Sequence, residues 1–185
     1  MDLGLAVILL PFVALIGVGL IFLNRRYNPG PLLFVQTRLG RAAVPFQIYK
    51  FRTMAVEGSG ARGALDPLDV QRIGALGAWL RRSRFDELPQ VINILRGEMS
   101  FIGPRPDQLD HAEFYVRHLP FYAGRLNVLP GISGLAQVTL GYAEGLAQTR
   151  AKARRDLVYV RHASFWLDAR ITWLTLISLV QHSGR

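Results

Sequence analysis

Leu3-Gly-Leu-Ala-Val-Ile-Leu-Leu-Pro-Phe-Val-Ala-Leu-Ile-Gly-Val-Gly-Leu-Ile-Phe-Leu23 decides how this chain is organised, because the stretch carries no charged or strongly polar side chain. About 20 apolar residues, rising roughly 1.5 Å each, are enough to cross the hydrocarbon core of a bilayer. No basic residue precedes the stretch and no small-residue cleavage pattern follows it, so we do not expect a signal peptide. Arg25 and Arg26 come next, and the positive-inside rule places the following residues on the cytoplasmic side.

Pro11 lies near the middle of this stretch, where it removes one backbone hydrogen bond and clashes with the preceding turn. A bend is therefore expected there. Two topologies remain open at this point. One is a kinked helix that spans the bilayer, and the other is a re-entrant helix that returns the chain to the side it entered. Residues 1–27 are predicted to be membrane-inserted in either case, and residues 28–185 to form one cytoplasmic domain.

The charge of the chain indicates a polyanionic partner. Lys and Arg total 22 against 13 Asp and Glu, a net charge of +9, and half of the 185 residues are hydrophobic, with a mean hydropathy of +0.21. Nucleic acid, anionic lipid and phosphorylated ligands all fit such a surplus. The complete lack of Cys excludes disulfides, thiolate nucleophiles and cysteine-based metal sites.

The remaining sequence predicts a mainly helical α+β fold. Turn residues dominate 28–31 and 130–134, and 57–67 is rich in Gly, Ala and charge, as in a mobile surface loop. Short apolar runs predict strands over 32–35 and 45–51. Apolar residues at helical spacing predict four helices, over 68–82, 86–96, 107–119 and 144–159.

The apolar stretch 165–180 has two interpretations. It contains Trp166 and Trp173 and one charged pair, Asp168 and Arg170. At 16 residues it is short for a membrane span. An amphipathic helix lying in the membrane interface, where Trp is favoured, and a helix of the protein core both fit the pattern.

Asp86 and Glu87 are adjacent carboxylates at a predicted helix start, following a run that contains Arg81, Arg82 and Arg84. Acidic residues there stabilise a helix by about 1 kcal/mol or less each. The functional interpretation uses the same physics, because helix N–H groups and guanidinium groups favour an ionised carboxylate and also bind phosphate. Such a carboxylate can attack phosphorus or hold a divalent metal, while the arginines offset the repulsion.

Two further basic clusters are candidates for binding an anionic substrate. Arg105 stands between Pro104 and Pro106, so its backbone has little freedom and the guanidinium is rigidly presented. Lys50 and Arg52 alternate with apolar residues and predict a strand with one basic face. An exposed Pro-rich turn and a solvated strand face are the structural alternatives. Aromatic residues interleaved with bases are sparse, so nucleic acid is not the expected partner.

Taken in order, these clusters resemble the small monotopic phosphoglycosyl transferases, also called bacterial sugar transferases. The resemblance covers nearly the whole chain and adds several segments to the apolar N-terminus with Pro11. They are Phe34-Val-Gln-Thr-Arg-Leu-Gly40, Lys50-Phe-Arg-Thr-Met54, Asp86-Glu-Leu-Pro-Gln90, Met99-Ser-Phe-Ile-Gly-Pro-Arg-Pro106, Pro130-Gly-Ile-Ser-Gly-Leu-Ala-Gln-Val138 and Asp156-Leu-Val-Tyr-Val160, with Asp168. Each segment is weakly specific alone, and their shared order makes coincidence improbable.

The resemblance implies a two-step transfer. Asp86 would attack the sugar-proximal phosphate of a UDP-sugar, release UMP and form an aspartyl phosphosugar, which polyprenol (undecaprenyl) phosphate would then attack. Glu87 would assist as a base or by positioning the metal, Mg²⁺ would sit at Asp86 and the pyrophosphate, and Arg81 and Arg105 would hold phosphate. The turn Pro104–Pro106 would help to hold the nucleotide.

The resemblance also implies a re-entrant helix, with the catalytic domain on the cytoplasmic face of the bacterial inner membrane. There the positive charge would attract anionic lipids and phosphorylated substrates alike. Two rival hypotheses need no catalysis: a membrane-anchored module that binds nucleic acid or anionic lipid, and a scaffold for other glycan enzymes. Neither rival requires an acidic pair set among arginines.

Overall fold

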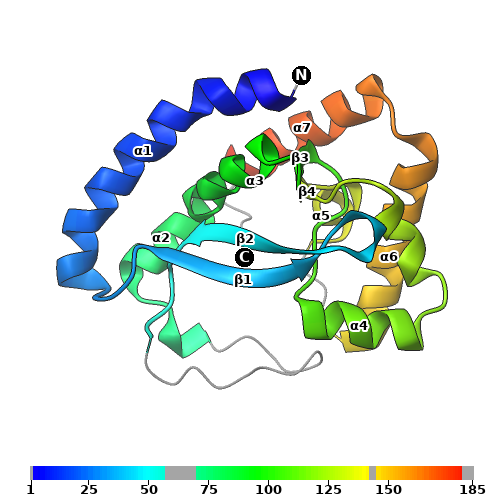
Figure 1. The fold of residues 1–185 in the computed structure, drawn as a ribbon, viewed down its shortest axis with the longest axis horizontal. Coiled ribbons are helices and arrows are strands. Elements are labelled where there is room, and N and C mark those ends of the chain that lie inside the picture. The colour runs from blue at the N-terminus through cyan, green and yellow to red at the C-terminus, as the bar shows by residue number, and fades with distance from the viewer. Residues whose placement is uncertain (1, 57–69, 142–144, 181–185) are drawn as a thin grey trace.

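A long helix, α1 (Asp2–Tyr27), runs along one side of the molecule, and the other elements lie on its inner side (Figure 1). The computed structural model describes residues 2–56, 70–141 and 145–180. The α1 helix is continuous through Pro11, and its ribbon follows an arc, so the bend expected from Pro11 does not break the helix. Its buried residues, Ala6, Val13, Gly17, Leu20 and Asn24, recur at helical spacing and form one stripe.

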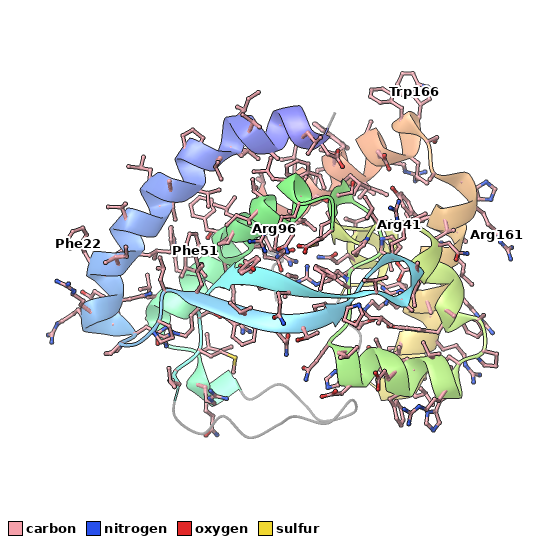
Figure 2. All side chains as sticks on the ribbon, in the orientation of Figure 1. Phe22, Arg41, Phe51, Arg96, Arg161 and Trp166 are labelled. Carbon is pink, nitrogen blue, oxygen red and sulfur yellow. The ribbon has the colours of Figure 1, made fainter. Side chains whose placement is uncertain are left out.

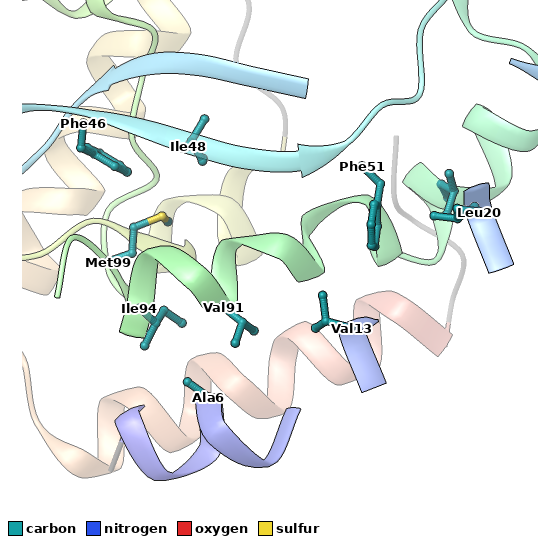
Figure 3. Close-up of a cluster of buried hydrophobic side chains, with 10 residues drawn as sticks. Ala6, Val13, Leu20, Phe46, Ile48, Phe51, Val91, Ile94 and Met99 are labelled. Carbon is teal, nitrogen blue, oxygen red and sulfur yellow. The ribbon is translucent and has the colours of Figure 1, made fainter. Parts of the chain in front are cut away.

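This buried stripe packs on the main hydrophobic core. Ala6 and Val13 face Val91 and Ile94 of the helix over residues 91–95 (Figure 3). Gly17 is packed so closely that a Cβ there would lie 3.6 Å from the ring of Phe51. At the N-terminal end, Ser100 Oγ donates a hydrogen bond to a carboxylate oxygen of Asp2 over 2.6 Å. Directly after the C-terminal end, Asn28 Oδ1 accepts a hydrogen bond from Arg52 over 2.7 Å, so both ends of α1 are attached to the same domain.

An antiparallel hairpin forms the centre of the domain. β1 (Leu33–Leu39) pairs with β2 (Pro45–Phe51), with Leu33 opposite Phe51 and Leu39 opposite Pro45. The predicted second strand is confirmed with its bounds. β1 is longer than the predicted 32–35, because pairing continues until the connection contains only residues 40–44. That connection includes one short 3-10 turn, η1 (Arg41–Ala43).

A second, parallel sheet pairs β3 (Ser100–Ile102) with β4 (Gly131–Ser133). The prediction of a turn over 130–134 was wrong, because 131–133 form this strand. The glycines there permit close backbone contact rather than chain reversal. A Cβ on Gly131 would lie 2.1 Å from the amide nitrogen of Gly103.

Helices make up most of the remaining chain, and most predicted helices are present. They are η2 (Val70–Arg72), α2 (Ala75–Arg82), η3 (Phe85–Gln90), α3 (Val91–Leu95), α4 (Leu109–His118), η4 (Tyr122–Asn127), α5 (Leu135–Leu140), α6 (Gly145–His162) and α7 (Phe165–Val180). The last of these has the predicted bounds. The helix predicted over 68–82 has its α-helical part only from Ala75, and the loop predicted over 57–67 lies outside the described residues. A second hydrophobic cluster joins α4, η4 and α6. The sequence analysis did not predict η4 or α5.

The helix predicted over 86–96 is divided in two. Its first part, η3, is a 3-10 turn that contains Pro89, and α-helical geometry starts at Val91. Proline has no N–H to donate, so the tighter turn accommodates it where an α-helical interior would not. Asp86 is consequently not an N-cap: the cap position is Arg84, in the left-handed conformation at φ 59°, and no side chain caps the turn.

Candidate active site

Glu87 is the centre of a buried ion cluster drawn from three elements. Lys50 Nζ on β2 lies 2.7 Å from Glu87 Oε1. Arg105, from the segment after β3, donates to both carboxylate oxygens, with Nη1 3.1 Å from Oε2. Arg84 Nη1 lies 3.9 Å from Oε2. Glu87 itself is only 4% exposed, so the fold brings residues 50, 87 and 105 together in an environment shielded from water.

The charges in this cluster fix the protonation of Glu87. Burial alone would raise the pKa of its carboxyl, but Arg105 and Lys50 outweigh burial through charge and hydrogen bonds and hold the pKa well below its usual range. Burial lowers the pKa of Lys50 to about 8, although the attraction of Glu87 opposes the shift. Glu87 is therefore an anion at neutral pH, and Lys50 is a cation that titrates within the working range of an enzyme.

Asp86 has a different environment from its neighbour. Its side chain is 8% exposed, and Oδ1 is buried with no hydrogen-bond partner among residues 2–56, 70–141 and 145–180. Burial, then the charge of Glu87, raises the pKa of Asp86, while Lys50, Arg105 and Arg81 oppose the shift. The sequence-based expectation placed the supporting guanidinium groups at Asp86, but the ion pairs of Arg84 and Arg105 form with Glu87.

The 3-10 turn explains why two adjacent carboxylates differ. At three residues per turn, successive side chains point about 120° apart, so Lys50 and Arg105 reach one of them directly. Leaving a buried acceptor unpaired costs roughly 1–3 kcal/mol, which a ligand at that oxygen would recover. Asp86 is thus the carboxylate with an oxygen available for chemistry, and Glu87 is the one already occupied by protein cations.

Arg81 is placed near Asp86 by the packing of α2 on the end of the hairpin. Arg81 Nε donates to Thr53 Oγ1 over 2.8 Å. The contact is close because Gly77 has no side chain: a Cβ there would lie 2.0 Å from the carbonyl oxygen of Thr53. From this position the charge of Arg81 acts on Asp86.

Arg52 is not part of the cluster. Its Nε donates to the carbonyl oxygen of Pro31 over 2.7 Å, and Nη1 donates to Asn28 Oδ1 over 2.7 Å and to the Met54 carbonyl oxygen over 3.0 Å. The sequence predicted Lys50 and Arg52 on one basic face of a strand, but β2 ends at Phe51, so Arg52 lies outside the strand. In this structure Arg52, which is 6% exposed, fastens the 28–31 turn.

The Pro104–Pro106 turn is held through its backbone carbonyl groups. Gly131 N–H donates to Pro104, Arg125 Nη2 donates to Arg105 over 2.6 Å, and Arg38 Nη1 donates to Pro106 over 3.1 Å. Pro104 and Pro106 themselves line a cavity of about 10 Å³, too small for a nucleotide. Their contribution in this structure is to present the guanidinium of Arg105.

A second buried ion network, which the sequence did not predict, supports that turn. Arg125 is 3% exposed and contacts Asp107 at 2.5 Å, Asp156 at 2.7 Å and the Tyr122 hydroxyl at 2.8 Å, while Lys152 Nζ lies 2.7 Å from Asp107. Burial would raise the pKa of Asp107, but Lys152 and Arg125 hold it below its usual range. In the sequence, only the family-like segment 156–160 pointed to a member of this network, Asp156, and it did not indicate what Asp156 does.

The donor set at Asp86 fits Mg²⁺. This ion takes oxygen ligands and commonly keeps waters, one or two carboxylates and substrate phosphates rather than a complete protein cage. The buried Oδ1 of Asp86, unpaired within the described chain, suits that chemistry. Within the described part of the chain no group of three or more His, Asp or Glu side chains could form a cage, so substrate phosphates would have to complete the coordination.

Comparison with known proteins decides the family. The family described as bacterial sugar transferase matches residues 1–182, which is nearly the whole chain. The chain belongs to the bacterial sugar transferase family.

Curated relatives of this bacterial sugar transferase carry related names. It is 40% identical, over its whole length, to a UDP-N-acetylgalactosamine-undecaprenyl-phosphate N-acetylgalactosaminephosphotransferase of Aeromonas hydrophila, of which it covers 44%. It is 41% identical over 83% of its length to a UDP-glucose:undecaprenyl-phosphate glucose-1-phosphate transferase of Caulobacter vibrioides, of which it covers 58%. The bacterial sugar transferase thus spans about half the length of these two proteins.

A shorter relative is matched over most of both chains. The exopolysaccharide production protein PSS of Rhizobium leguminosarum is 36% identical to this bacterial sugar transferase over 96% of the chain, which covers 90% of that protein. The segment that this transferase shares with its longer relatives therefore also occurs nearly by itself.

Proposed function

We propose that this bacterial sugar transferase moves a sugar 1-phosphate from a UDP-sugar to polyprenol phosphate through a covalent intermediate on Asp86, and so initiates bacterial glycan assembly. One observation carries the proposal. Among the described residues Asp86 keeps a buried oxygen without a partner beside three cations, whereas the adjacent Glu87 is fully paired. The names of the relatives support the two substrates, a UDP-sugar and undecaprenyl phosphate.

In the first step an Asp86 carboxylate oxygen attacks the sugar-proximal phosphorus of the UDP-sugar. A new oxygen–phosphorus bond forms, the bond to the bridging oxygen breaks, and UMP leaves with the electron pair. Arg105, Lys50 and Arg81 stabilise the negative charge that gathers on the phosphoryl oxygens. Mg²⁺ at Asp86 and the pyrophosphate would supply further charge neutralisation.

In the second step an oxygen of polyprenol phosphate attacks the same phosphorus. The bond from phosphorus to Asp86 breaks, the carboxylate is regenerated, and the product is a polyprenyl diphosphate sugar. Because the attacking phosphate is already anionic, the step needs no strong base. Glu87, held as an anion by Arg105 and Lys50, serves best as the group that positions those two cations around the reacting phosphate.

The arrangement of α1 supports a site at the membrane surface. Among the described residues α1 alone is long and apolar enough to cross a bilayer. Its outer face exposes large apolar side chains, including Ile8, Leu15 and Phe22. Figure 2 shows Phe22 of α1 and Trp166 of α7 directed away from the body of the molecule. Membrane lipid is the environment that suits these surfaces.

The same contacts support a re-entrant α1 and an interfacial α7 on the cytoplasmic face of the inner membrane. Asp2 accepts a hydrogen bond from Ser100, and Asn28, directly after α1, accepts one from Arg52, so both ends of α1 belong on the side of the domain. α7 exposes Phe165, Trp166 and Trp173, and aromatic side chains favour the headgroup region. Anionic lipids there would be attracted by the net charge of +9.

The test is to trap the covalent intermediate. Wild-type protein incubated with Mg²⁺ and a sugar-labelled UDP-sugar, without acceptor, is expected to release UMP and retain the label on Asp86. Asp86→Asn is expected to abolish both signals with unchanged thermal unfolding, and Asp110→Asn, at an exposed position of α4, is the matched control. A wild-type protein that releases no UMP from a panel of UDP-sugars, even with polyprenol phosphate added, yet binds anionic vesicles, would favour the non-catalytic rivals.

A further inference from the structure

Three aromatic side chains connect the membrane helix to the turn that carries Asp86. Phe85 immediately precedes Asp86, and its ring centroid lies 6.3 Å from that of Phe12 on α1 and 5.5 Å from that of Trp79 on α2. Both pairs are edge-to-face. We call Phe12, Trp79 and Phe85 the aromatic ledge. Through Phe85 the ledge directly adjoins Asp86 in the sequence.

The ledge is open rather than buried. Trp79 is 48% exposed and Phe12 is 46% exposed, while Phe85 between them is partly buried against the main core. Ile8 and Leu15 stand four residues before and three residues after Phe12, so they share its face of α1, and both are exposed. An apolar track therefore runs from the outer face of α1 to Phe85.

The inner end of the track is cationic. Arg81 follows Trp79 by two residues, and Arg84 precedes Phe85 with its guanidinium 3.9 Å from Glu87. Arg81 and Arg105 both act electrostatically on Asp86. The surface therefore matches a ligand with a hydrocarbon chain at one end and a phosphate at the other, with the phosphate directed at Asp86.

We propose that the aromatic ledge binds the first isoprene units of the polyprenol phosphate acceptor and thereby aims its phosphate at the aspartyl phosphosugar. The inference rests on the proposed function. In a polyprenol phosphate the hydrocarbon begins at the phosphate oxygen itself. An enzyme that binds this acceptor therefore needs an apolar surface next to the site where the acceptor phosphate attacks. A phospholipid instead places a glycerol backbone and ester groups between its phosphate and its chains, and so offers polar atoms where the ledge offers rings.

The first experiment separates acceptor binding from donor chemistry. Trp79→Ala is expected to raise the KM for undecaprenyl phosphate about tenfold, and to leave unchanged the acceptor-independent release of UMP and the trapping of label on Asp86. Trp79→Phe, which keeps an aromatic ring, is expected to restore most of the lost affinity. Trp166→Ala on α7, where the side chain is 80% exposed, is the matched control and should leave that KM unchanged.

A second experiment measures contact without turnover. A polyprenyl phosphate with a diazirine in its second isoprene unit is incorporated with the full chain into phosphatidylethanolamine–phosphatidylglycerol nanodiscs and irradiated. Labelling is expected in the peptide containing residues 79–85, and unmodified undecaprenyl phosphate should compete it away while excess phosphatidylglycerol should not. Because the probe reports binding alone, this result is independent of whether an intermediate forms on Asp86.

Several results would overturn the ledge. In the labelling experiment, a diazirine phospholipid that labels the 79–85 peptide equally well, or labelling confined to α7, would contradict the proposal. In the kinetic experiment, Trp166→Ala raising the KM for undecaprenyl phosphate as much as Trp79→Ala, or Trp79→Ala raising the KM for the UDP-sugar instead, would contradict it. Failure of the proposed function looks different, since then the wild-type protein would trap no sugar phosphate at all.

Discussion

Arg125 Nη2 donates a hydrogen bond to the backbone carbonyl oxygen of Arg105 over 2.6 Å, so the guanidinium that holds Glu87 is itself positioned by a buried guanidinium. Arg125 is in turn fixed by Asp107 and Asp156. Asp156 lies on α6, far along the chain from the turn that carries Glu87. The ion cluster at Glu87 therefore depends on a second network from another part of the fold.

Arg125→Lys tests this dependence, because it keeps the charge but loses the forked geometry that contacts two carboxylates and a carbonyl group together. Loss of one such hydrogen bond in a buried site costs about 1–3 kcal/mol. We expect acceptor-independent UMP release to slow at least tenfold at a temperature well below the thermal unfolding midpoint of the variant, where loss of folded protein does not explain the slower rate. Arg117→Lys, in an exposed α4 ion pair, is the control. Unchanged kinetics with a lowered unfolding midpoint would reduce Arg125 to a purely structural residue.

Glu87→Gln should destabilise the protein, because it removes the carboxylate that pairs directly with the buried cations of Lys50 and Arg105. Breaking a buried ion pair from one side typically costs about 3–5 kcal/mol. Glu113→Gln removes an exposed partner of Arg117 and should change the free energy of unfolding by about 1 kcal/mol or less. The two variants can be compared by denaturant unfolding in the same detergent. Equal stabilities would mean that Glu87 contributes no buried charge compensation.

Lys50 predicts opposite effects of alkaline pH on activity and on stability. Burial lowers its pKa from 10.5 to about 8, so the folded protein binds fewer protons than the unfolded chain between those values, and the contribution of Lys50 to the free energy of unfolding rises with pH there. The cation that faces Glu87 and the incoming phosphate is nevertheless lost above about pH 8. UMP release should therefore fall as pH passes about 8.

Lys50→Arg is the control for this pH profile, because a guanidinium stays protonated well above pH 8. The variant is expected to be less active at neutral pH but to lose the alkaline decline. The profile is measured as single-turnover UMP release between pH 6 and pH 10. A decline at the same pH in Lys50→Arg would assign the titration to another group.

Gly77→Ala should separate α2 from the end of the hairpin. The added Cβ would lie 2.0 Å from the carbonyl oxygen of Thr53, so the helix must shift and carry Arg81 away from its place near Asp86. We expect a loss of about 1–3 kcal/mol in stability together with a slower donor step. Gly74→Ala is the matched control, since it has an ordinary extended φ of −70° and a Cβ there would meet nothing closer than 4.0 Å. A silent Gly77→Ala would show that α2 can relax without cost.

The sequence predicted those features that depend on neighbouring residues. Residues 45–51 and 165–180 form the expected strand and helix, because their periodicity and punctuation are local. The sequence also shows that Asp86 and Glu87 are adjacent. It does not show which of the two is ion-paired, because the partners of Glu87, Lys50 and Arg105, come from distant segments. The sequence also did not predict the 131–133 strand, because its Gly131 and the following Gly134 are explained by close contact with Gly103, about 30 residues earlier.

The placement of α1 gives the last prediction. Asp2 lies at the start of α1, and its carboxylate accepts a hydrogen bond from Ser100 over 2.6 Å. With the proposed re-entrant α1, this contact predicts that both residues lie on one side of the bilayer. The chain has no Cys, so Asp2→Cys with Ser100→Cys creates the only two thiols. A short bis-maleimide added to inverted membrane vesicles should link them within one chain, and each single variant should give no linked product. A helix that spans the membrane would instead leave the thiol at position 2 open to an impermeant maleimide from the periplasmic side while the thiol at position 100 stayed protected, and no cross-link could form.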